Sequence, residues 1–359
     1  MTRRGGIDMP ASSGHRLVVA IGVPYSDALR QEIAREVARV APHAEVRDIA
    51  ALIREERRLR REGSQAEGLA KAKADLDKHL VDVNILFTLP VVPDLPARAP
   101  RLRWVHFISA GVDHVMTQEL VRSPVQVTDS GGITSAGMAE YALGVMLLFA
   151  KRLWTYERQK RKREWCKEDV IPVELHGHTV GILGVGGIGL QVARLAKAFG
   201  MRVLGVRRGT TAPETGVGDV DEMLSPSALH DMLGRSDYVV IALPATKDTE
   251  RLFGERELRA MKPSAYLVNV GRGSVVDEPA LVRALKEGWI AGAGLDVFSR
   301  EPLPPESELW GLPNVYMTPH VSGNLLGVEP PIMALFCDNL RRYLVGEPMK
   351  NLVNKEAGY

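Results

Sequence analysis

The sequence has 359 residues, of which 45% are hydrophobic and 25% are charged, a composition typical of a globular protein. Lysines and arginines number 46 against 44 acidic residues, so the formal net charge of +2 excludes a general attraction to nucleic acid or anionic membranes. The longest apolar stretch, residues 141–150, is too short to cross a bilayer, which takes about 20 residues. We therefore expect a soluble protein of two domains, without nucleic-acid or membrane partners.

The chain begins with residues 1–14, which hold arginines, glycines and serines but no apolar core of signal-peptide length. This composition predicts a flexible tail and a cytoplasmic protein. The two cysteines, Cys166 and Cys337, show no paired spacing, which fits a reducing compartment. The nine histidines form no metal-binding motif, and we predict no metal site.

The first part of the chain predicts one α/β unit. An amphipathic helix is expected over residues 27–40, and the mixed charges of residues 54–62 are typical of a solvated helix or loop. Short buried strands are predicted over residues 17–21, 83–87 and 104–108. Residues 135–154 form a strongly helical segment with apolar side chains at core spacing, and we expect this helix to bridge two units.

From residue 179 the alternation of strands and helices resumes. Strands are predicted over residues 179–183, 202–206, 238–243, 265–270, 292–297 and 315–317. Strands separated by helical or looped stretches require a parallel sheet. Ser225 and Pro226 are typical of a helix N-cap followed by proline in the first turn. The last helix, residues 331–344, follows the final strand, and we expect it to return to the first unit and leave a cleft between the two.

A glycine-rich loop stands between the strand at residues 179–183 and a helical stretch at residues 191–199. In this context the first glycine permits a tight turn, the second lets the backbone approach a pyrophosphate, and the third allows close helix packing. Free N–H groups at the helix start face the anion. We therefore predict a dinucleotide site. Its predicted residues are Gly184, Gly186, Gly187, Ile188 and Gly189.

Two arginines follow the next strand, where enzymes selective for NAD usually place an acid that accepts from the ribose 2′-hydroxyl. Arg207 and Arg208 cannot accept that bond, but a guanidinium suits the 2′-phosphate of NADP. We therefore predict a preference for NADP, with NAD as the less favoured cofactor. Two solvated surface arginines are the alternative interpretation.

Three further charged side chains, Arg272, Glu301 and His320, each come shortly after a predicted strand. Open parallel sheets bind ligands at the carboxyl ends of their strands, so a cation, an acid and a base are expected at that edge. Taken singly, each residue also fits a structural interpretation, as a surface cation, a loop carboxylate and a strand-end histidine.

Four segments, residues 184–189, 268–273, 296–303 and 318–323, resemble in order the signatures of the D-2-hydroxyacid dehydrogenases, and among these the NADP-dependent glyoxylate and hydroxypyruvate reductases. The resemblance covers most of the chain. It implies two doubly wound parallel-sheet α/β domains, Rossmann-like or flavodoxin-like, with a cleft between them. The dinucleotide-binding domain is predicted at 129–323, and the substrate-binding domain at 15–128 and 324–359.

The resemblance also implies that Arg272, Glu301 and His320 form the active site, and the chemistry of these residue types agrees. Reduction of a 2-oxo acid needs a proton at the carbonyl oxygen, which a histidine such as His320 supplies near neutral pH. A carboxylate on the other ring nitrogen fixes the tautomer, so Glu301 is the expected orienting partner. Arg272 is expected to bind the substrate carboxylate and to polarise the carbonyl.

Further contacts are implied by the resemblance alone. The substrate carboxylate is expected on a loop after residues 104–108, although a purely structural turn is the alternative there. The residues of this loop are Ser109, Ala110 and Gly111. The remaining cofactor contacts are expected from Pro244 and Thr249 near the adenosine, and from Val270, Gly271, Asp296, His320 and Gly323 near the nicotinamide. For Asp296, bonding to nearby backbone is the alternative.

The sequence therefore predicts an oxidoreductase that reduces small 2-oxo acids, such as glyoxylate or hydroxypyruvate, to D-2-hydroxy acids. The alternative function is a nucleotide-sensing corepressor, because some relatives use the same scaffold to bind peptide partners. The family commonly dimerises through the region of residues 135–154, so we expect a homodimer. A core position is expected for Trp165, with approach to a neighbouring subunit's substrate as the alternative.

Overall fold

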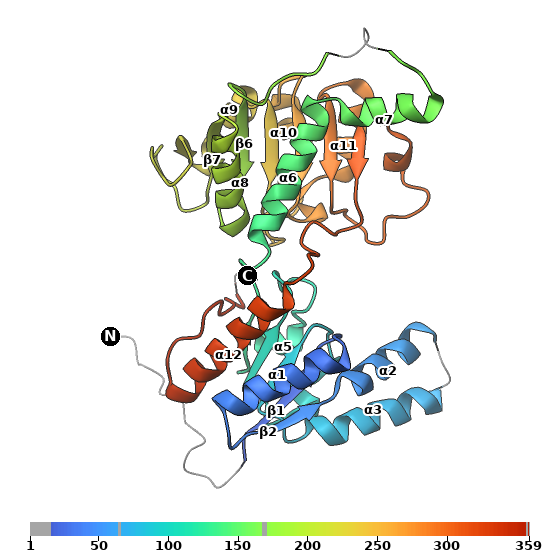
Figure 1. Cartoon of the computed structure of the whole chain (residues 1–359), viewed down its shortest axis with the longest axis vertical. Coiled ribbons are helices and arrows are strands. Elements are labelled where there is room, and N and C mark those ends of the chain that lie inside the picture. The colour runs from blue at the N-terminus through green and yellow to red at the C-terminus, as the bar shows by residue number, and fades with distance from the viewer. Residues whose placement is uncertain (1–15, 64–65, 167–170, 357, 359) are drawn as a thin grey trace. The chain divides into compact units, whose positions relative to one another are not determined.

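The computed structural model describes residues 16–63, 66–166, 171–356 and 358. The predicted tail, residues 1–14, lies outside this described part. The chain divides into two compact units, the first running to Ile133 and resuming at Gly327, and the second formed by Thr134–Leu326. Both units consist of a parallel sheet with helices, as the alternating pattern predicts (Figure 1).

The sheet of the first unit has five parallel strands in the order β2-β1-β3-β4-β5. The strands are β1 (Val18–Gly22), β2 (Glu45–Asp48), β3 (Ile85–Thr88), β4 (Trp104–Phe107) and β5 (Gln126–Thr128). The helices are α1 (Asp27–Val40), α2 (Ala50–Arg61), α3 (Ala66–Leu80), α4 (Leu95–Arg98), α5 (Gln118–Arg122) and α12 (Glu329–Val345). This strand order reverses direction between β1 and β3, as in flavodoxin-like folds.

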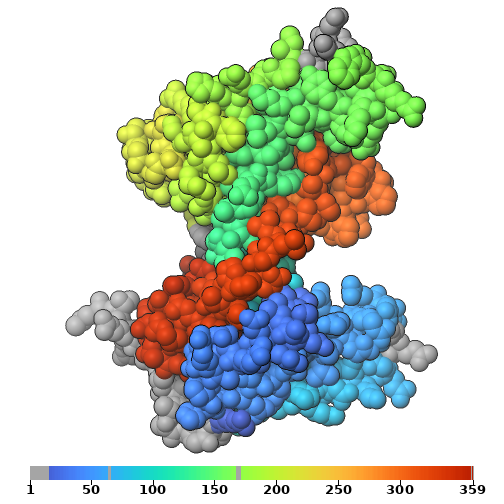
Figure 2. Space-filling model, in the orientation of Figure 1, coloured from blue at the N-terminus to red at the C-terminus, as the bar shows by residue number. Residues whose placement is uncertain are grey.

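Both faces of this sheet are covered, which explains why its central strands are apolar on both sides. Helices α1 and α12 pack on one face, and α2 to α5 pack on the other. Phe336 of α12 is fully buried and stacks on Phe87 of β3, with 4.4 Å between ring centroids. Figure 2 shows the C-terminal segment, in red, against the N-terminal segment, in blue, on this face of the unit.

The charged run at residues 54–62, predicted as a solvated helix or loop, is helical up to Arg61, but one of its charged side chains is buried. Glu56 of α2 is buried and pairs with the buried Arg98 at 2.8 Å. Arg98 also bonds Asp77 of α3. A buried carboxylate requires such partners, and the sequence did not reveal them because Arg98 lies 42 residues away.

The sheet of the second unit has seven parallel strands in the order β12-β11-β10-β9-β6-β7-β8. The strands are β6 (Thr179–Leu183), β7 (Arg202–Val206), β8 (Glu222–Leu224), β9 (Tyr238–Ile241), β10 (Tyr266–Asn269), β11 (Gly292–Leu295) and β12 (Val315–Met317). The helices are α6 (Ser135–Ala150), α7 (Leu153–Lys162), α8 (Gly187–Ala198), α9 (Leu229–Arg235), α10 (Glu255–Ala260) and α11 (Glu278–Glu287). Short 3₁₀ helices cover Pro226–Ala228, Gly273–Val275 and Glu308–Gly311.

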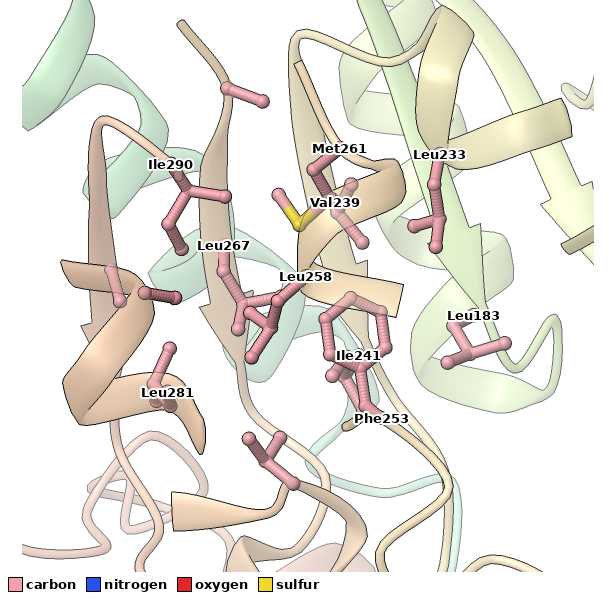
Figure 3. Packing of buried hydrophobic residues seen from close by; sticks show 14 of the residues in the cluster. Leu183, Leu233, Val239, Ile241, Phe253, Leu258, Met261, Leu267, Leu281 and Ile290 are labelled. Carbon is pink, nitrogen blue, oxygen red and sulfur yellow. The ribbon is translucent and has the colours of Figure 1, made fainter. Parts of the chain in front are cut away.

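Two apolar layers hold this sheet. On one face α6 and α8 cover Val180, Ile182 and Val240. On the other face α9, α10 and α11 cover a cluster that includes Leu183, Leu233, Val239, Ile241, Phe253, Leu258, Met261, Leu267, Leu281 and Ile290 (Figure 3). Because the central strands are buried on both sides, the sequence reads there as continuous apolar runs.

Two local predictions were wrong in part. The helix expected over residues 135–154 stops at Ala150, because Arg152 adopts a left-handed conformation with φ of 55° and donates to the Tyr266 hydroxyl. Ser225 is an N-cap with Pro226 in the first turn, as predicted, but the helix is a 3₁₀ helix that leads into α9, and the Ser225 hydroxyl bonds Ser227 instead of capping the backbone. Among the described helices, none is long and apolar enough to cross a membrane.

Candidate active site

The predicted site residues of the second unit follow the carboxyl ends of its strands. Strand order reverses between β6 and β9, and open parallel sheets bind ligands in the crevice at such a reversal. The glycine loop follows β6, residues 242–249 follow β9, and Arg272 follows β10. Glu301 and His320 follow β11 and β12 along the same edge.

The glycine loop has the geometry that its three spaced glycines predict. Gly184 has a φ of +99°, and a Cβ there would lie 2.8 Å from the Ala242 carbonyl oxygen. A Cβ on Gly189 would lie 2.3 Å from the Gly184 carbonyl oxygen, so only glycine lets α8 start this close to β6. A Cβ on Gly186 would meet nothing within 4 Å. The loop therefore leaves open space beside Gly186, where a ligand can approach the backbone.

This open space lies at the start of α8, whose N-cap is Gly186. The first N–H groups of a helix have no partner within the helix, and they carry the positive end of its dipole. An anion such as a pyrophosphate suits that position, and Gly187 and Ile188 of the first turn would hold it. The residues present thus fit a dinucleotide.

Arg207 and Arg208 come directly after β7, as predicted. Their side chains are 44% and 63% exposed and lie 3.9 Å from Glu214 and 3.8 Å from Asp248, respectively. Ion pairs this long and exposed are weak. Both side chains thus lie at the surface after β7, and their contact with a 2′-phosphate stays a prediction.

The residues after β9 form a closed loop. The Thr249 hydroxyl donates to the Pro244 carbonyl at 2.7 Å and lies 3.1 Å from the Thr246 hydroxyl. Thr249 thus holds the shape of the loop. The contacts of Pro244 and Thr249 with an adenosine stay predictions.

Glu301 and His320 are in direct contact. The Nδ1 atom of His320 lies 2.7 Å from Oε2 of Glu301, and Oε1 of Glu301 accepts from the Phe298 N–H at 3.0 Å. The side chains remain 46% and 34% exposed for His320 and Glu301, so a substrate can reach the ring. His320 has a φ of 56°, a conformation that residues other than glycine seldom adopt and that clusters at functional sites.

Arg272 lies on the turn after β10, which packs against Leu243 and Phe298. A Cβ on Gly271 would lie 2.6 Å from the Leu243 carbonyl oxygen, and one on Gly273 would overlap the backbone of Phe298. Gly271 thus lets the turn of Arg272 approach Leu243, and Gly273 lets it approach Phe298, whose N–H binds Glu301. The Arg272 Nη1 donates to the Gly271 carbonyl at 2.9 Å.

Asp296 and Val270 are fully buried beneath this edge. The Asp296 carboxylate accepts from the N–H groups of Val321 and Ser322, both at 2.9 Å, and from the Thr318 hydroxyl. The alternative of backbone bonding thus describes what Asp296 does here. Since neither residue presents accessible surface in this conformation, their contacts with a nicotinamide stay predictions, as do those of Gly271 and Gly323.

The predicted substrate loop belongs to the first unit and follows β4. Its Ser109 carbonyl accepts from the Ser130 N–H at 2.9 Å, and Ala110 is exposed. The Ser109 hydroxyl is buried and has no hydrogen-bond partner. Gly111 is half-buried. A loop with exposed backbone and an unused hydroxyl can bind a polar ligand.

Two titratable groups lie near this loop: the buried His106 just before it in the sequence, and the half-buried Asp129 next to Ser130, which donates to it. His106 of β4 bonds Thr128 at 2.7 Å and Ser130 at 3.2 Å, and burial lowers the pKa of its ring to about 3. The Asp129 carboxylate accepts from the Gly131 N–H at 2.9 Å, and burial raises its pKa to about 6. His106 is therefore neutral at physiological pH.

Sequence reasoning did not predict the contact between Tyr141 and Thr318. Tyr141 of α6 was assigned to the core by its helical spacing, yet its hydroxyl lies 2.6 Å from the Thr318 hydroxyl. The available signal was the residue type, because a tyrosine in a core needs a partner for its hydroxyl.

The core position expected for Trp165 was wrong. Its side chain is 88% exposed and lines a surface groove with Tyr156, Cys166 and Ile171, after α7 has ended at a left-handed Arg163. The described part of the chain holds no cluster of three or more histidine, cysteine or acidic side chains that could bind a metal ion.

Comparisons with known proteins identify the family of this chain. A family model described as D-isomer specific 2-hydroxyacid dehydrogenase, NAD binding domain, matches residues 143–322. A glyoxylate reductase of Thermococcus gammatolerans is 42% identical over 268 residues, which cover 72% of this chain and 78% of that protein. Another from Korarchaeum cryptofilum is 38% identical over 279 residues, which cover 76% of this chain and 82% of that protein.

Solved structures show the same fold over nearly the whole chain. The NADPH-dependent glyoxylate/hydroxypyruvate reductase of Sinorhizobium meliloti, solved with NADP and sulfate, is similar with a TM-score of 0.77 and 29% identity. The match covers 96% of this chain and 100% of that one. A D-isomer specific 2-hydroxyacid dehydrogenase family protein of Aeromonas salmonicida gives a TM-score of 0.78 at 30% identity, covering 95% and 100%.

Proposed function

The chain belongs to the D-isomer specific 2-hydroxyacid dehydrogenase family, and we propose that it reduces small 2-oxo acids of the glyoxylate and hydroxypyruvate type to D-2-hydroxy acids. The observation that carries this proposal is the contact between Glu301 and His320, at 2.7 Å, on the carboxyl edge of a parallel sheet that also carries the glycine loop. An orienting acid, an accessible imidazole and a dinucleotide loop together suit a reductase.

The glycine loop would hold the cofactor. Gly186 leaves room for the pyrophosphate, Gly187 and Ile188 offer N–H groups, and Gly184 and Gly189 let β6 and α8 approach each other. The chemistry that a bound nicotinamide dinucleotide supplies is transfer of a hydride to the carbonyl carbon of the substrate.

His320 supplies the proton. Because Nδ1 of the ring bonds the Glu301 carboxylate, Nε2 is the atom left to face the substrate. A protonated ring donates from Nε2 to the carbonyl oxygen as that oxygen gains negative charge. Glu301 stabilises the positive charge of the ring and keeps it oriented, and the Phe298 N–H keeps Glu301 oriented in turn.

Arg272 is the proposed residue for the other end of the substrate. A 2-oxo acid carries a carboxylate beside its carbonyl group. Arg272 suits both groups, because a guanidinium binds a carboxylate with two parallel bonds and also stabilises a developing oxyanion. That the loop of Ser109, Ala110 and Gly111 also binds this carboxylate stays a prediction; Ala110 of this loop is exposed.

NADP is the proposed preferred cofactor. Arg207 and Arg208 are exposed after β7, and their charge suits the 2′-phosphate. The similar Sinorhizobium meliloti enzyme is NADPH-dependent by its printed name. NAD is the expected second cofactor.

A homodimer is the proposed assembly. The apolar side chains of Leu153, Trp165 and Ile171 are 53%, 88% and 79% exposed around α7, and such exposed apolar groups suit an interface. Sedimentation that shows a stable monomer at micromolar concentration would contradict this. The cytoplasmic location and the absence of nucleic-acid and membrane partners stay predictions.

Consumption of NADPH with a panel of 2-oxo acids tests the function. We expect turnover with glyoxylate and hydroxypyruvate. Tight binding of NADPH without turnover of any 2-oxo acid would contradict the proposal and favour the nucleotide-sensing corepressor. The family match and the intact pair of Glu301 and His320 do not favour that alternative.

A further inference from the structure

A short series of hydrogen bonds connects α6 to the loop that carries His320. The Tyr141 hydroxyl of α6 lies 2.6 Å from the Thr318 hydroxyl, which comes directly after β12. The Thr318 hydroxyl lies 2.5 Å from Oδ1 of Asp296, which comes directly after β11. Both distances are those of strong O–H···O bonds.

The direction of these bonds follows from the chemistry of the three groups. An ionised carboxylate only accepts, and both oxygens of Asp296 also accept a backbone N–H, from Val321 and Ser322. The Thr318 hydroxyl must therefore donate to Asp296. Its oxygen then accepts a hydrogen bond from the Tyr141 hydroxyl, so the phenol is the terminal donor. Burial raises the pKa of Tyr141 to about 12, which keeps the phenol protonated at neutral pH.

These bonds fix the backbone on both sides of His320. The His320 N–H donates to the Asp296 carbonyl at 2.8 Å and also lies 3.1 Å from the Thr318 carbonyl. The next two residues, Val321 and Ser322, donate to the Asp296 carboxylate. The left-handed conformation of His320, with φ of 56°, persists because its neighbours are held in this way.

We propose that Tyr141 is a positioning residue for the reduction, because its phenol holds Thr318 and Asp296 and thereby aims the imidazole of His320. Tyr141 itself does not take part in the proton transfer. This inference rests on the proposed function, in which His320 is the proton donor. The alternative is that the Tyr141 ring only fills the core under α6.

Tyr141→Phe separates these two roles, because it keeps the ring and removes only the hydroxyl. Small misplacements of a reacting group are costly, so we expect kcat with NADPH and glyoxylate to fall at least about tenfold. The KM for NADPH should change less than about twofold, because the glycine loop is untouched. Tyr316→Phe is the matched control, since Tyr316 packs in the same cluster but its hydroxyl is not part of this series of bonds. Its kcat should stay within about twofold of the unmodified protein.

A double variant identifies the path of the effect. If Tyr141 acts through His320, Tyr141→Phe will not lower the residual turnover of His320→Gln any further. Likewise, Tyr141→Phe will not lower the turnover of Thr318→Val any further, because that variant already lacks the hydroxyl that joins Tyr141 to Asp296. An equal loss from Tyr141→Phe in all three backgrounds would show a merely structural role and overturn the proposal.

A measurement independent of activity separates this proposal from the proposed function. The ring resonances of His320 in histidine-labelled protein are assigned by their disappearance in His320→Gln. We expect Tyr141→Phe to shift or broaden these resonances and Tyr316→Phe to leave them unchanged. Unchanged resonances in Tyr141→Phe would overturn the positioning role. A shift in a protein that turns over no 2-oxo acid would support the positioning of His320 while contradicting the function.

Discussion

Gly186 and Gly189, in the loop after β6, are expected to respond differently to alanine: one substitution should lower cofactor affinity and the other should lower stability. At Gly189 the new Cβ would lie 2.3 Å from the Gly184 carbonyl oxygen, and backbone cannot move aside as a flexible side chain can. Overpacking of this kind costs about 1–3 kcal/mol or more, so Gly189→Ala should lower the free energy of unfolding by at least about 2 kcal/mol. Gly186→Ala meets nothing within 4 Å and should cost under about 1 kcal/mol.

Cofactor affinity, in contrast, should be lowered mainly by Gly186→Ala. The methyl group of Gly186→Ala would fill the space beside the first turn of α8, where the backbone N–H groups would face a bound pyrophosphate. Loss of one hydrogen bond to a charged group costs about 1.5–3 kcal/mol. Since about 1.4 kcal/mol corresponds to a factor of ten, the Kd for NADPH should rise about ten- to a hundredfold.

Urea denaturation and NADPH fluorescence titration measure the two effects. Gly234→Ala, in α9, is the matched control, because its Cβ would make only an ordinary contact at 3.7 Å from the Ala260 carbonyl oxygen. Its stability should rise slightly and its affinity for NADPH should not change. Unchanged NADPH affinity in Gly186→Ala would refute the assignment of this loop to the pyrophosphate.

Three other substitutions test separate parts of the account. Glu301→Gln should lower kcat about ten- to a hundredfold with little effect on the Kd for NADPH, because loss of a group that orients a reacting histidine typically lowers activity by about that factor. Steady-state rates near those of the unmodified protein would count against an orienting role. Burial raises the pKa of Asp129 from 3.8 to about 6, so the folded state binds more protons than the unfolded state and stability falls as pH rises between these values. Asp129→Asn should remove up to about 3 kcal/mol of that loss. In urea denaturation the variant should be more stable than the unmodified protein at pH 7.5 and equally stable at pH 4. An equal difference at both pH values would argue against a raised pKa of the Asp129 carboxylate. Arg207→Asp combined with Arg208→Ser should move the ratio of kcat/KM values from NADPH toward NADH, and an unaltered ratio would refute the 2′-phosphate assignment.

The strands of both sheets that are buried on two sides were predictable from the sequence. β6 and β7 were predicted with the bounds that the structure has, because each is a short apolar run between polar or glycine residues. The edge strand β2, Glu45–Asp48, was missed because three of its four side chains are charged and none is buried. The break between α6 and α7 was missed as well, because lysine and arginine are good helix formers and the left-handed Arg152 is held by a distant partner, Tyr266.

The candidate site, too, was predictable from the sequence only in part. The ordered motifs indicated Glu301 and His320, and the structure places their side chains in contact. The bonds from Tyr141 through Thr318 to Asp296 were not predictable, because they depend on how α6 faces the ends of β11 and β12. Neither the spacing of residues along the chain nor their types specify such an approach between distant segments.

The most direct test of the central claim is the turnover of His320→Gln with NADPH and glyoxylate, measured beside its Kd for NADPH. The account predicts that the unmodified protein consumes NADPH, that the variant loses most of this turnover, and that the Kd stays nearly the same. Turnover by the variant close to that of the unmodified protein would contradict the role of His320 as the proton donor.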